Sequence, residues 1–304
     1  MTNIVFLNGK FVPYKRAVVP ISTHALHYGT GCFEGIRGYW NSEQKKLYVF
    51  RLADHYRRLA RSCRTLSMRL PTTTPQLCRI TIELLKRCRH KTGVYIRPLV
   101  YKSDPTVTRF NLKKLADGFA ILTEPLGHYL DVSSGITAIT SVWLRVSARM
   151  IPPFAKPTGI YLNTALAKTE AENRGADEAI LTNPDGSISE GSAENIFLVK
   201  AGCLHTPSLD QNILEGITRN TIIELAKKEL GISTIQRKIM SAELTTADEV
   251  FLTGTGAEVT PVIEINSRKI GSGRVGPITR RLQDLYFQIV NGQNPKYARW
   301  LSKI

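Results

Sequence analysis

A run of small residues that leads into an apolar strand is the feature that most constrains this chain. Residues 186–199 read Gly-Ser-Ile-Ser-Glu-Gly-Ser-Ala-Glu-Asn-Ile-Phe-Leu-Val, so one acid, Glu190, lies among serine, glycine and alanine. Small side chains let a backbone approach a bulky, flat group closely. The apolar segment 195–199 indicates a buried strand directly after them. We therefore expect Glu190 to lie in a buried position beside a ligand rather than in a solvated turn.

A lysine upstream, Lys156, completes the same chemistry. It lies in Phe-Ala-Lys-Pro-Thr-Gly-Ile-Tyr, residues 154–161, between strand-like segments. A partly buried lysine loses its proton readily and can form an imine with a carbonyl group. Pyridoxal phosphate needs such a lysine, a group facing its pyridine nitrogen and a cup for its phosphate. We therefore predict this cofactor, with Lys156 preferred over Lys168 because Lys168 lies within a helical pattern.

Two further segments could bind the phosphate group. Residues 214–220 open a helix after a glycine, and the free N–H groups of a helix start attract anions, although simple capping by Thr218 gives the same pattern. The turn 253–258 follows an apolar strand and lacks the third glycine of a dinucleotide fingerprint. Arg51 and Arg97 are further candidate anion binders, because an arginine buried in an apolar strand needs a partner.

The succession of strands and helices predicts an α+β protein of two domains. The 304 residues suffice for two domains of ordinary size. Strands and helices mix without regular βαβ alternation, which argues against a doubly wound parallel sheet. The turn-rich stretch 126–135 is the expected interdomain loop. It separates a small N-terminal domain, residues 1–125, from a large C-terminal domain, residues 136–304.

Apolar spacing and turn signals place the individual elements. Asn8-Gly9 predicts a hairpin turn, Asp54 is a candidate N-cap, and Pro75 suits the first turn of a helix. Strands are expected at 4–7, 10–13, 47–50, 94–101, 118–123, 136–147, 178–182, 195–199 and 250–252. Helices are expected at 54–66, from 74 onward, at 164–174, 218–230 and 279–290.

The composition excludes several classes of protein. No apolar run is long enough to span a bilayer, and the first residues lack the basic start of a signal peptide, so the cytoplasm is expected. Five cysteines without a Cys-x-x-Cys pair argue against a disulfide framework and a zinc site, and we expect buried or half-buried thiols. His24 and His27 have the spacing of a metal pair, but no third ligand is visible, and no metal is predicted.

The net charge of +16, from 41 basic and 25 acidic residues, raises the possibility of nucleic-acid binding. The basic residues cluster at 57–64 and 86–91, in segments with helical apolar spacing. No aromatic residues alternate with them, so we interpret both clusters as solvated helix faces. A basic nucleic-acid-binding protein is the remote alternative, and attraction of anionic substrates explains the charge equally well.

Taken in order, several motifs resemble those of the fold-type-IV pyridoxal-phosphate enzymes, and specifically the branched-chain amino acid aminotransferases. The matching stretches are 24–30, 33–37, 95–99, 188–191, 194–195, 216–219, 254–255 and 257–258. The resemblance implies a D-amino-acid aminotransferase-like fold with a smaller N-terminal α/β domain and a larger, barrel-like C-terminal domain. It also implies reversible amino transfer between branched-chain L-amino acids (leucine, isoleucine, valine) and 2-oxoglutarate by a ping-pong mechanism.

The resemblance further implies how the cofactor is held. Lys156 would be the Schiff-base lysine and would move the proton of the substrate α-carbon. Glu190 would face the pyridine nitrogen, and Tyr161 would bond the phenolic oxygen. The phosphate would be held by Arg51, the backbone N–H groups of Ile217 and Thr218, and Thr255.

Substrate contacts are implied in the same way. Tyr95 and the turn Thr255–Gly256 would receive the α-carboxylate, and Arg97 would receive the distal carboxylate of glutamate. The side-chain pocket would be lined by Phe33, Tyr129 and Tyr161. In such enzymes Tyr28 and the loop 103–109 reach the site from a second subunit, so at least a homodimer is implied, with amino acids and 2-oxo acids as the other partners.

Three stretches depart from the usual family pattern. Residues 158–161 read Thr-Gly-Ile-Tyr where Gly-Gly-Asn-Tyr is usual, and Leu126 stands where bacterial members often carry tryptophan. The loop 102–109 adds Arg109 where the pocket rim is usually apolar. A wider pocket with a cation at its mouth would admit larger or anionic substrates, D-amino acids or (R)-amines. A D-amino-acid or (R)-amine transaminase, or a lyase of the aminodeoxychorismate type, is therefore the alternative within the same fold.

Overall fold

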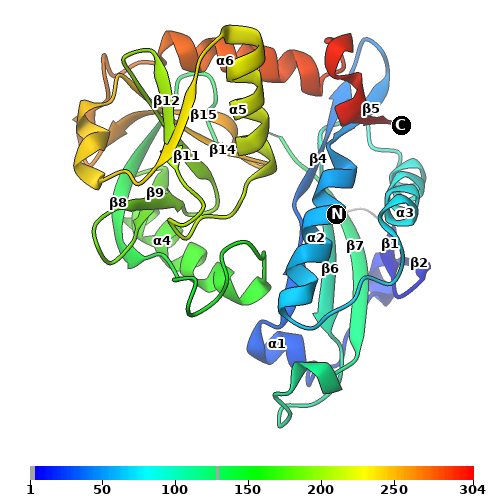
Figure 1. Cartoon of the computed structure of the whole chain (residues 1–304). Helices are drawn as coiled ribbons and strands as arrows, with labels where there is room; N and C mark the ends of the chain where they lie inside the picture. Colours follow the sequence, from blue (N-terminus) through cyan, green and yellow to red (C-terminus); the bar gives the residue numbers. More distant parts are fainter. Residues whose placement is uncertain (1–3, 128–129) are drawn as a thin grey trace. The chain divides into compact units, whose positions relative to one another are not determined.

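The computed structural model describes residues 4–127 and 130–304 and divides into two compact units (Figure 1). Each unit combines a sheet with helices, so the predicted α+β class is confirmed. The domain limits predicted above (1–125, 126–135 and 136–304) stay a prediction. Unit 1 comprises Met1–Gly127, Ala155–Ile160 and Gln288–Ile304, and unit 2 comprises His128–Phe154 and Tyr161–Phe287.

Unit 1 contains a sheet in the order β17-β5-β4-β6-β7-β1-β2, with β3 also paired to β6, and its paired strands are antiparallel. The strands are β1 (Ile4–Leu7), β2 (Lys10–Pro13), β3 (Gly31–Phe33), β4 (Ile36–Asn41), β5 (Lys46–Phe50), β6 (Val94–Lys102), β7 (Asp117–Pro125) and β17 (Leu301–Lys303). The helices are α1 (His24–Tyr28), α2 (Leu52–Thr65) and α3 (Thr74–Cys88), with 3-10 turns at Tyr14–Arg16, Leu112–Lys114, Thr158–Ile160 and Pro295–Trp300.

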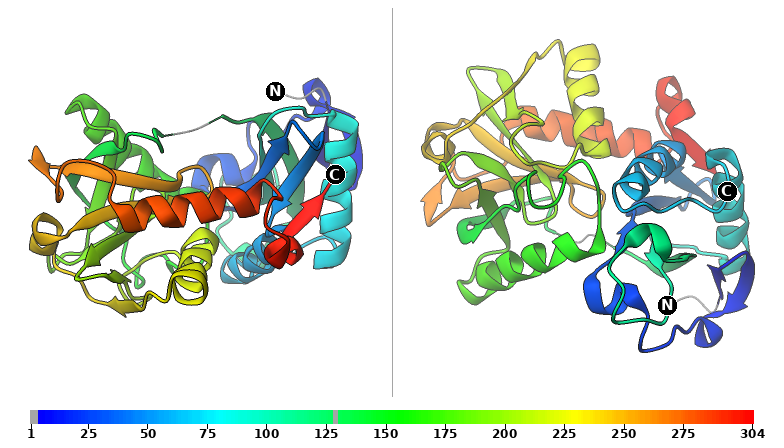
Figure 2. Two further views of the ribbon diagram at one scale, coloured as in Figure 1. Left: turned by 90° about the horizontal axis from the view of Figure 1, so that it is seen from above. Right: turned by 60° about the horizontal axis from the view of Figure 1, so that its bottom comes forward.

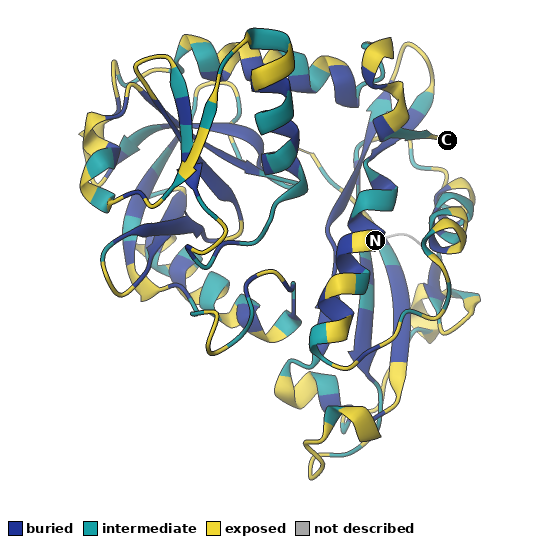
Figure 3. Ribbon diagram, viewed as in Figure 1, coloured by how far each residue is buried: buried dark blue, intermediate teal, exposed yellow. Residues whose placement is uncertain are grey.

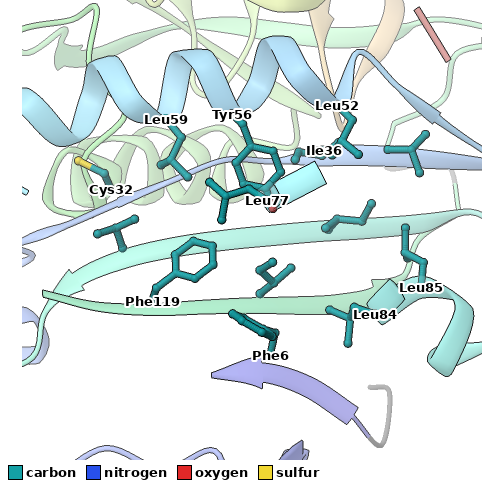
Figure 4. Close-up of a cluster of buried hydrophobic side chains, with 14 of the residues drawn as sticks. Phe6, Cys32, Ile36, Leu52, Tyr56, Leu59, Leu77, Leu84, Leu85 and Phe119 are labelled. Carbon is teal, nitrogen blue, oxygen red and sulfur yellow. The ribbon is translucent and has the colours of Figure 1, made fainter. Parts of the chain in front are cut away.

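The core of unit 1 lies between its sheet and the helices α2 and α3 (Figure 4). Leu52, Tyr56 and Leu59 share one face of α2 because they are spaced at i, i+4 and i+7. Leu77 and Leu84 of α3 are fully buried in the same cluster. Burial of each such side chain stabilises the unit by about 1.5–3 kcal/mol. This packing fixes α2 against the sheet and therefore fixes the polar residues at the edge of the same helix face.

Unit 2 contains a sheet in the order β10-β9-β8-β15-β14-β11-β12-β13, with β16 paired to β15. Both parallel and antiparallel pairs occur in it. The strands are β8 (Ile136–Leu144), β9 (Glu178–Thr182), β10 (Ile188–Gly191), β11 (Asn195–Lys200), β12 (Cys203–Pro207), β13 (Thr234–Arg237), β14 (Glu249–Gly254), β15 (Glu258–Ile265) and β16 (Arg268–Lys269). The helices are α4 (Tyr161–Asn173), α5 (Ile217–Leu230) and α6 (Pro277–Val290), of which α6 belongs to unit 2 as far as Phe287, with a 3-10 turn at Ser241–Thr246.

The helices of unit 2 cover its curled sheet, with α4 packed against β8 and β9 and α5 against β13 and β14 (Figure 2). The strands are mostly buried, whereas the outer helix faces are exposed (Figure 3). Phe197 and Phe251 lie opposite each other on β11 and β14, and their rings stack with centroids 5.0 Å apart. Such stacking adds to the apolar area that the sheet already buries. In residues 4–127 and 130–304, no helix has the length and apolar character that a bilayer crossing requires.

Two sequence expectations about α2 are wrong. The helix begins at Leu52 rather than after Asp54, because Arg51 takes the left-handed conformation (φ 49°) and acts as the N-cap. The carboxylate of Asp54 instead accepts a hydrogen bond from Arg51 Nε at 2.6 Å. The basic segment 57–64 is also not uniformly solvated. The side chain of Arg57 is 67% exposed, whereas Arg58 is buried at 5%.

Other boundaries shift by a few residues. The strand expected at 136–147 ends at Leu144, and the helix expected at 164–174 begins at Tyr161. The hairpin at Asn8-Gly9 is confirmed, since both residues have positive φ, and Gly231 ends α5 in the left-handed conformation. Cys32 and Cys63 are buried and the other three cysteines are half-buried, as expected.

Candidate active site

The segment that carries Lys156 is held on both sides by unit 1. The backbone N–H of Phe33 donates to the Lys156 carbonyl at 3.1 Å, and the Lys156 N–H donates to Ser62 Oγ at 3.0 Å. Pro157 forms an isolated bridge with Cys32 of β3. Lys156 lies outside any helix or strand and is thereby fixed to β3 and α2. The backbone of Lys156, from which its side chain extends, consequently has a defined position in unit 1.

The Lys156 ammonium group is destabilised by its surroundings. Burial, followed by the positive charge of Arg58, lowers the pKa of Lys156 to about 8, and Arg97 acts in the same direction. The Lys156 Nζ lies 5.0 Å from the centroid of the Phe33 ring. With a pKa of about 8, about a tenth of the amine is neutral at pH 7, far more than in an ordinary lysine. The amine can therefore act as a nucleophile toward a carbonyl group.

Tyr95 and Arg97 lie on one face of β6, two residues apart. Arg97 Nη2 donates to the Tyr95 hydroxyl at 2.7 Å, and its guanidinium carbon lies 4.2 Å from the centroid of the Phe33 ring. Its Nε is buried and has no hydrogen-bond partner within the part of the chain that the structure describes. Both residues line a cavity of about 220 Å³, to which Glu124 also contributes. This face can therefore accept an anion.

Tyr28 and Arg51 lie elsewhere in unit 1. The Tyr28 hydroxyl donates to the Val107 carbonyl at 2.6 Å, so it meets the loop with which the sequence associates it. The Arg51 guanidinium lies 4.8 Å from the centroid of the Trp300 ring and pairs with Asp54. Tyr129 lies outside the described residues.

In unit 2, Glu190 is buried at 4%, as its small neighbours predict. Arg145 Nη2 lies 2.6 Å from Glu190 Oε1, and Oε2 accepts hydrogen bonds from Asn195 Nδ2 at 2.9 Å and from the Leu214 N–H at 3.0 Å. These donors all favour the ionised carboxylate. Glu190 is therefore a fixed negative charge inside the unit.

The start of α5 lies beside the same acid. Its N-cap, Gly216, provides no side-chain cap to the first N–H groups of the helix, which include those of Ile217 and Thr218. A Cβ at Gly216 would lie 2.0 Å from Asn195 Oδ1, so only glycine fits. Asn195 thus contacts both Glu190 and the helix start. The uncapped helix start is a suitable site for a phosphate.

Three more predicted residues lie at the start of a unit 2 helix or in a turn between unit 2 strands. Thr255 and Gly256 are half-buried in the turn that joins β14 to β15, and Tyr161 is the half-buried first residue of α4. The hydroxyls of Thr253, at the end of β14, and of Ser189, next to Glu190 on β10, are buried and have no hydrogen-bond partner among the described residues.

The structure therefore groups the predicted residues in two sets. Lys156, Phe33, Tyr95 and Arg97 lie together in unit 1. Glu190 lies near the start of α5 in unit 2.

Sequence reasoning missed four charged or polar residues around these sets. They are Glu34, His55 and Arg58, which form one buried cluster in unit 1, and Arg145, which pairs with Glu190. The i, i+3 spacing of His55 and Arg58 was a possible signal, because it places both on one helix face. Arg145 follows a strand and gave no such signal.

Comparison with known families decides the classification. Residues 31–265 match the family described as Amino-transferase class IV, which is well over half of the chain. The chain belongs to the class IV aminotransferases. This aminotransferase is 48% identical over 305 residues to a "Probable branched-chain-amino-acid aminotransferase" of Aquifex aeolicus (strain VF5), with 99% of this chain and 97% of the relative covered. It is 37% identical to the "Branched-chain-amino-acid aminotransferase" of Escherichia coli (strain K12), with the same coverage of both chains.

Solved structures agree with this classification. A branched-chain aminotransferase from Thermoproteus uzoniensis with norvaline is 44% identical, with a TM-score of 0.95 over 100% of this chain and 99% of that chain. The branched-chain amino acid aminotransferase from Thermobaculum terrenum in its PLP-form is 36% identical, with a TM-score of 0.93 over 99% and 98% of the two chains. The overall fold of this aminotransferase is therefore that of its family.

For this aminotransferase we predict that Gly216→Ala lowers the free energy of unfolding by about 1–3 kcal/mol, because the new Cβ would displace Asn195 or the start of α5. Gly127→Ala is the matched control, since a Cβ there meets nothing within 4 Å. Urea unfolding of both variants measures the difference. Equal stability of the two variants would show that the Asn195 contact does not constrain the helix start.

Proposed function

We propose that this class IV aminotransferase is a pyridoxal-phosphate-dependent branched-chain amino acid aminotransferase. It transfers amino groups reversibly between branched-chain L-amino acids and 2-oxoglutarate by a ping-pong mechanism. The observation that carries the proposal is Lys156, whose backbone is fixed by Phe33 and Ser62 and whose pKa is lowered to about 8. The names of the relatives supply the substrate class.

The residues present fit this cofactor. A Schiff-base lysine must lose its proton near neutral pH, and the lowered pKa of Lys156 meets that need. A phosphate needs exposed N–H donors, and the uncapped start of α5 offers them. Among the described residues, the buried hydroxyls of Ser189 and Thr253 have no hydrogen-bond partner. Ser189 lies on β10 next to Glu190, and Thr253 lies on β14 shortly before Thr255.

In the proposed arrangement, unit 1 supplies the reactive amine and most substrate contacts. Lys156 would link to the cofactor, and Arg51 would bind its phosphate. Tyr95 would receive the substrate α-carboxylate, and Arg97 would receive the distal carboxylate of glutamate through its guanidinium group. Further substrate contacts would come from Tyr28, Phe33 and Tyr129.

Unit 2 supplies the groups for the ring and the phosphate. Glu190 would face the pyridine nitrogen, held ionised by its three donors. Tyr161 would bond the phenolic oxygen. Ile217 and Thr218 would bind the phosphate through their N–H groups. Thr255 would contact both the phosphate and the substrate carboxylate, the latter together with Gly256.

The chemistry follows from these assignments. When bound, pyridoxal phosphate supplies an electron sink for the substrate α-carbon. Lys156 Nζ, in its neutral form, accepts the proton from that carbon, and its ammonium form returns a proton. Arg97 and Tyr95 orient the substrate by its carboxylates, so that the α-hydrogen points consistently toward one base.

We predict a visible absorption band for the purified chain with added pyridoxal phosphate, bleached faster by L-leucine than by D-alanine or an (R)-amine. Lys156→Ala should lose the band and the transamination activity, whereas Lys168→Arg, a change in the rival lysine, should keep both. Bleaching only by D-alanine or the (R)-amine would reject the branched-chain assignment. A band that persists in Lys156→Ala would show that Lys156 is not the Schiff-base lysine.

A second prediction concerns the charge of Glu190. Glu190→Gln should lower the single-turnover rate with L-leucine at least tenfold, an increase of about 1.4 kcal/mol in the barrier, while cofactor affinity changes less. The neutral amide cannot keep a ring nitrogen protonated as a carboxylate does. Rapid-mixing spectroscopy measures the rate and a spectral titration the affinity. An unchanged rate would rule out the ring-nitrogen role.

We also propose that the chain is a homodimer or a larger homo-oligomer and acts in the cytoplasm. Exposed apolar side chains in unit 1 support an interface, since Val18 and Ile21 are 74% and 81% exposed and Phe110 is 68% exposed. Sedimentation equilibrium should give at least twice the chain mass of 33.9 kDa. A monomer at micromolar concentration would contradict the assembly, and activity confined to a membrane or secreted fraction would contradict the location.

A further inference from the structure

Helices α2 and α3 and the turns beside them carry most of the positive charge of this chain. Together these elements comprise residues 51–91, which contain eleven basic and two acidic residues, so their net charge is +9. The net charge of the whole chain is +16. More than half of it therefore lies in 41 of the 304 residues.

Nine of these eleven cations are exposed, and only Arg51 and Arg58 are not. On α2, Arg57, Arg61 and Arg64 share one face because they are spaced at i, i+4 and i+7. The other six lie on α3 or in the adjoining turns: Arg69, Arg79, Lys86, Arg87, Arg89 and Lys91. We call these nine side chains the basic surface.

The two helices bring the basic surface to one side of unit 1. Helices α2 and α3 contact each other, and both cover the same core with their apolar faces. The exposed residues of each helix lie opposite these apolar faces (Figure 3). The two basic segments that are separate in the sequence are therefore neighbours in the fold.

The acids of this region do not neutralise the basic surface. Asp54 already pairs with Arg57, and Glu83 pairs with Arg87. In the parts of the chain that the structure describes, the following cations form no ion pair: Arg64, Arg69, Arg79, Lys86, Arg89 and Lys91. Like charges three or four residues apart oppose helix formation. The stability of α2 and α3 therefore does not explain this arrangement.

The residue types of the basic surface indicate the class of partner. Seven of the nine cations are arginine, whose planar guanidinium can bind phosphate oxygens through two N–H groups at once. Within residues 51–91, all of which the structure describes, no large apolar side chain is exposed. Membrane surfaces and protein interfaces use such side chains as anchors, and single-stranded nucleic acids stack on exposed aromatic rings. A duplex requires only cations that face its phosphates.

The spacing of the cations suits a duplex as well. The row from Arg57 to Arg64 and the row from Arg79 to Lys86 each span seven residues, about 10 Å of helix axis. Over that length one strand of a duplex presents about three phosphates. Two such rows could therefore neutralise about five or six phosphates.

We propose that the basic surface binds the phosphate backbone of a double-stranded nucleic acid, RNA or DNA, without preference for its sequence. The arginine and lysine side chains neutralise phosphates and release the cations that surround the free duplex. The inference is independent of the proposed function, since it uses only the charge and exposure of residues in unit 1.

The test measures binding of the full-length chain, supplied with pyridoxal phosphate, to short fluorescent RNA and DNA duplexes of equivalent sequence. Fluorescence anisotropy follows binding between about 50 and 200 mM KCl. We expect a dissociation constant on the order of 10⁻⁶ M at the lowest salt concentration. The logarithm of the binding constant should fall with the logarithm of the KCl concentration with a slope of about −4 to −5, as five phosphate contacts require.

The variant Arg64→Gln/Arg79→Gln/Lys86→Gln removes three cations of the basic surface and leaves no acid without its partner. It should bind both duplexes at least about tenfold more weakly at 50 mM KCl. The salt slope should become less steep by about 2 to 3, because three phosphate contacts are lost.

The matched control is Lys227→Gln/Arg268→Gln/Arg281→Gln, which removes the same residue types from exposed positions in unit 2. It lowers the net charge equally, so it should weaken binding by less than about threefold and leave the slope unchanged. Both triple variants should retain the transamination rate of the unsubstituted chain, because none of the six residues belongs to the proposed site.

Binding that is lost in the first variant and kept in the control supports the proposal, and tighter binding of one duplex identifies it as RNA or DNA. Equal loss in both variants would overturn the proposal, since net charge alone would then explain the binding. Absence of duplex binding at 50 mM KCl, tighter binding of single strands, or binding of phosphatidylserine vesicles in place of duplexes would also overturn it. None of these results changes the visible band or its bleaching by L-leucine, so the proposed function is tested separately.

Discussion

The bidentate ion pair between Glu34 and Arg58 links helix α2, which packs against the apolar core of unit 1, to the residue after Phe33, an anchor of Lys156. On one side, α2 packs Leu52, Tyr56 and Leu59 against the sheet. On the other side, the same helix carries Arg58, which adjoins the anchors of Lys156. A buried charge is tolerated only with matched partners, so this region of the unit has one favourable arrangement. Contacts with the packed core in this way restrict the position of the Lys156 backbone.

Unit 2 also contains a buried carboxylate that is paired with an arginine. Glu190 is a buried anion whose partners are Arg145, Asn195 and a backbone N–H. Asn195 also restricts the residue before α5 to glycine. One side chain thus couples the acid to the helix start that offers N–H groups for a phosphate. Each unit therefore holds a buried charge with matched partners, and fixed charges of this kind favour electrostatic catalysis.

Local signals allowed the sequence to predict much of this. The small residues around Glu190 predicted its burial, and periodic apolar residues placed α3 and α5 closely. The predictions that failed concern residues whose partners lie far away in the sequence. In the sequence, Arg58 resembles part of a solvated basic helix, but in the structure it is buried and paired with Glu34, 24 positions away. The pairing of Arg145 with Glu190 likewise depends on the sheet of unit 2, which brings distant segments together.

The most direct test of the central claim follows the amino group itself. The chain, supplied with pyridoxal phosphate, is incubated with nitrogen-15-labelled L-leucine and unlabelled 2-oxoglutarate, and mass spectrometry determines where the label is found. We expect glutamate that carries the nitrogen-15 label, together with an equal amount of 4-methyl-2-oxopentanoate. Loss of leucine without labelled glutamate, or no reaction while D-alanine transfers its nitrogen, would contradict branched-chain transamination by this chain.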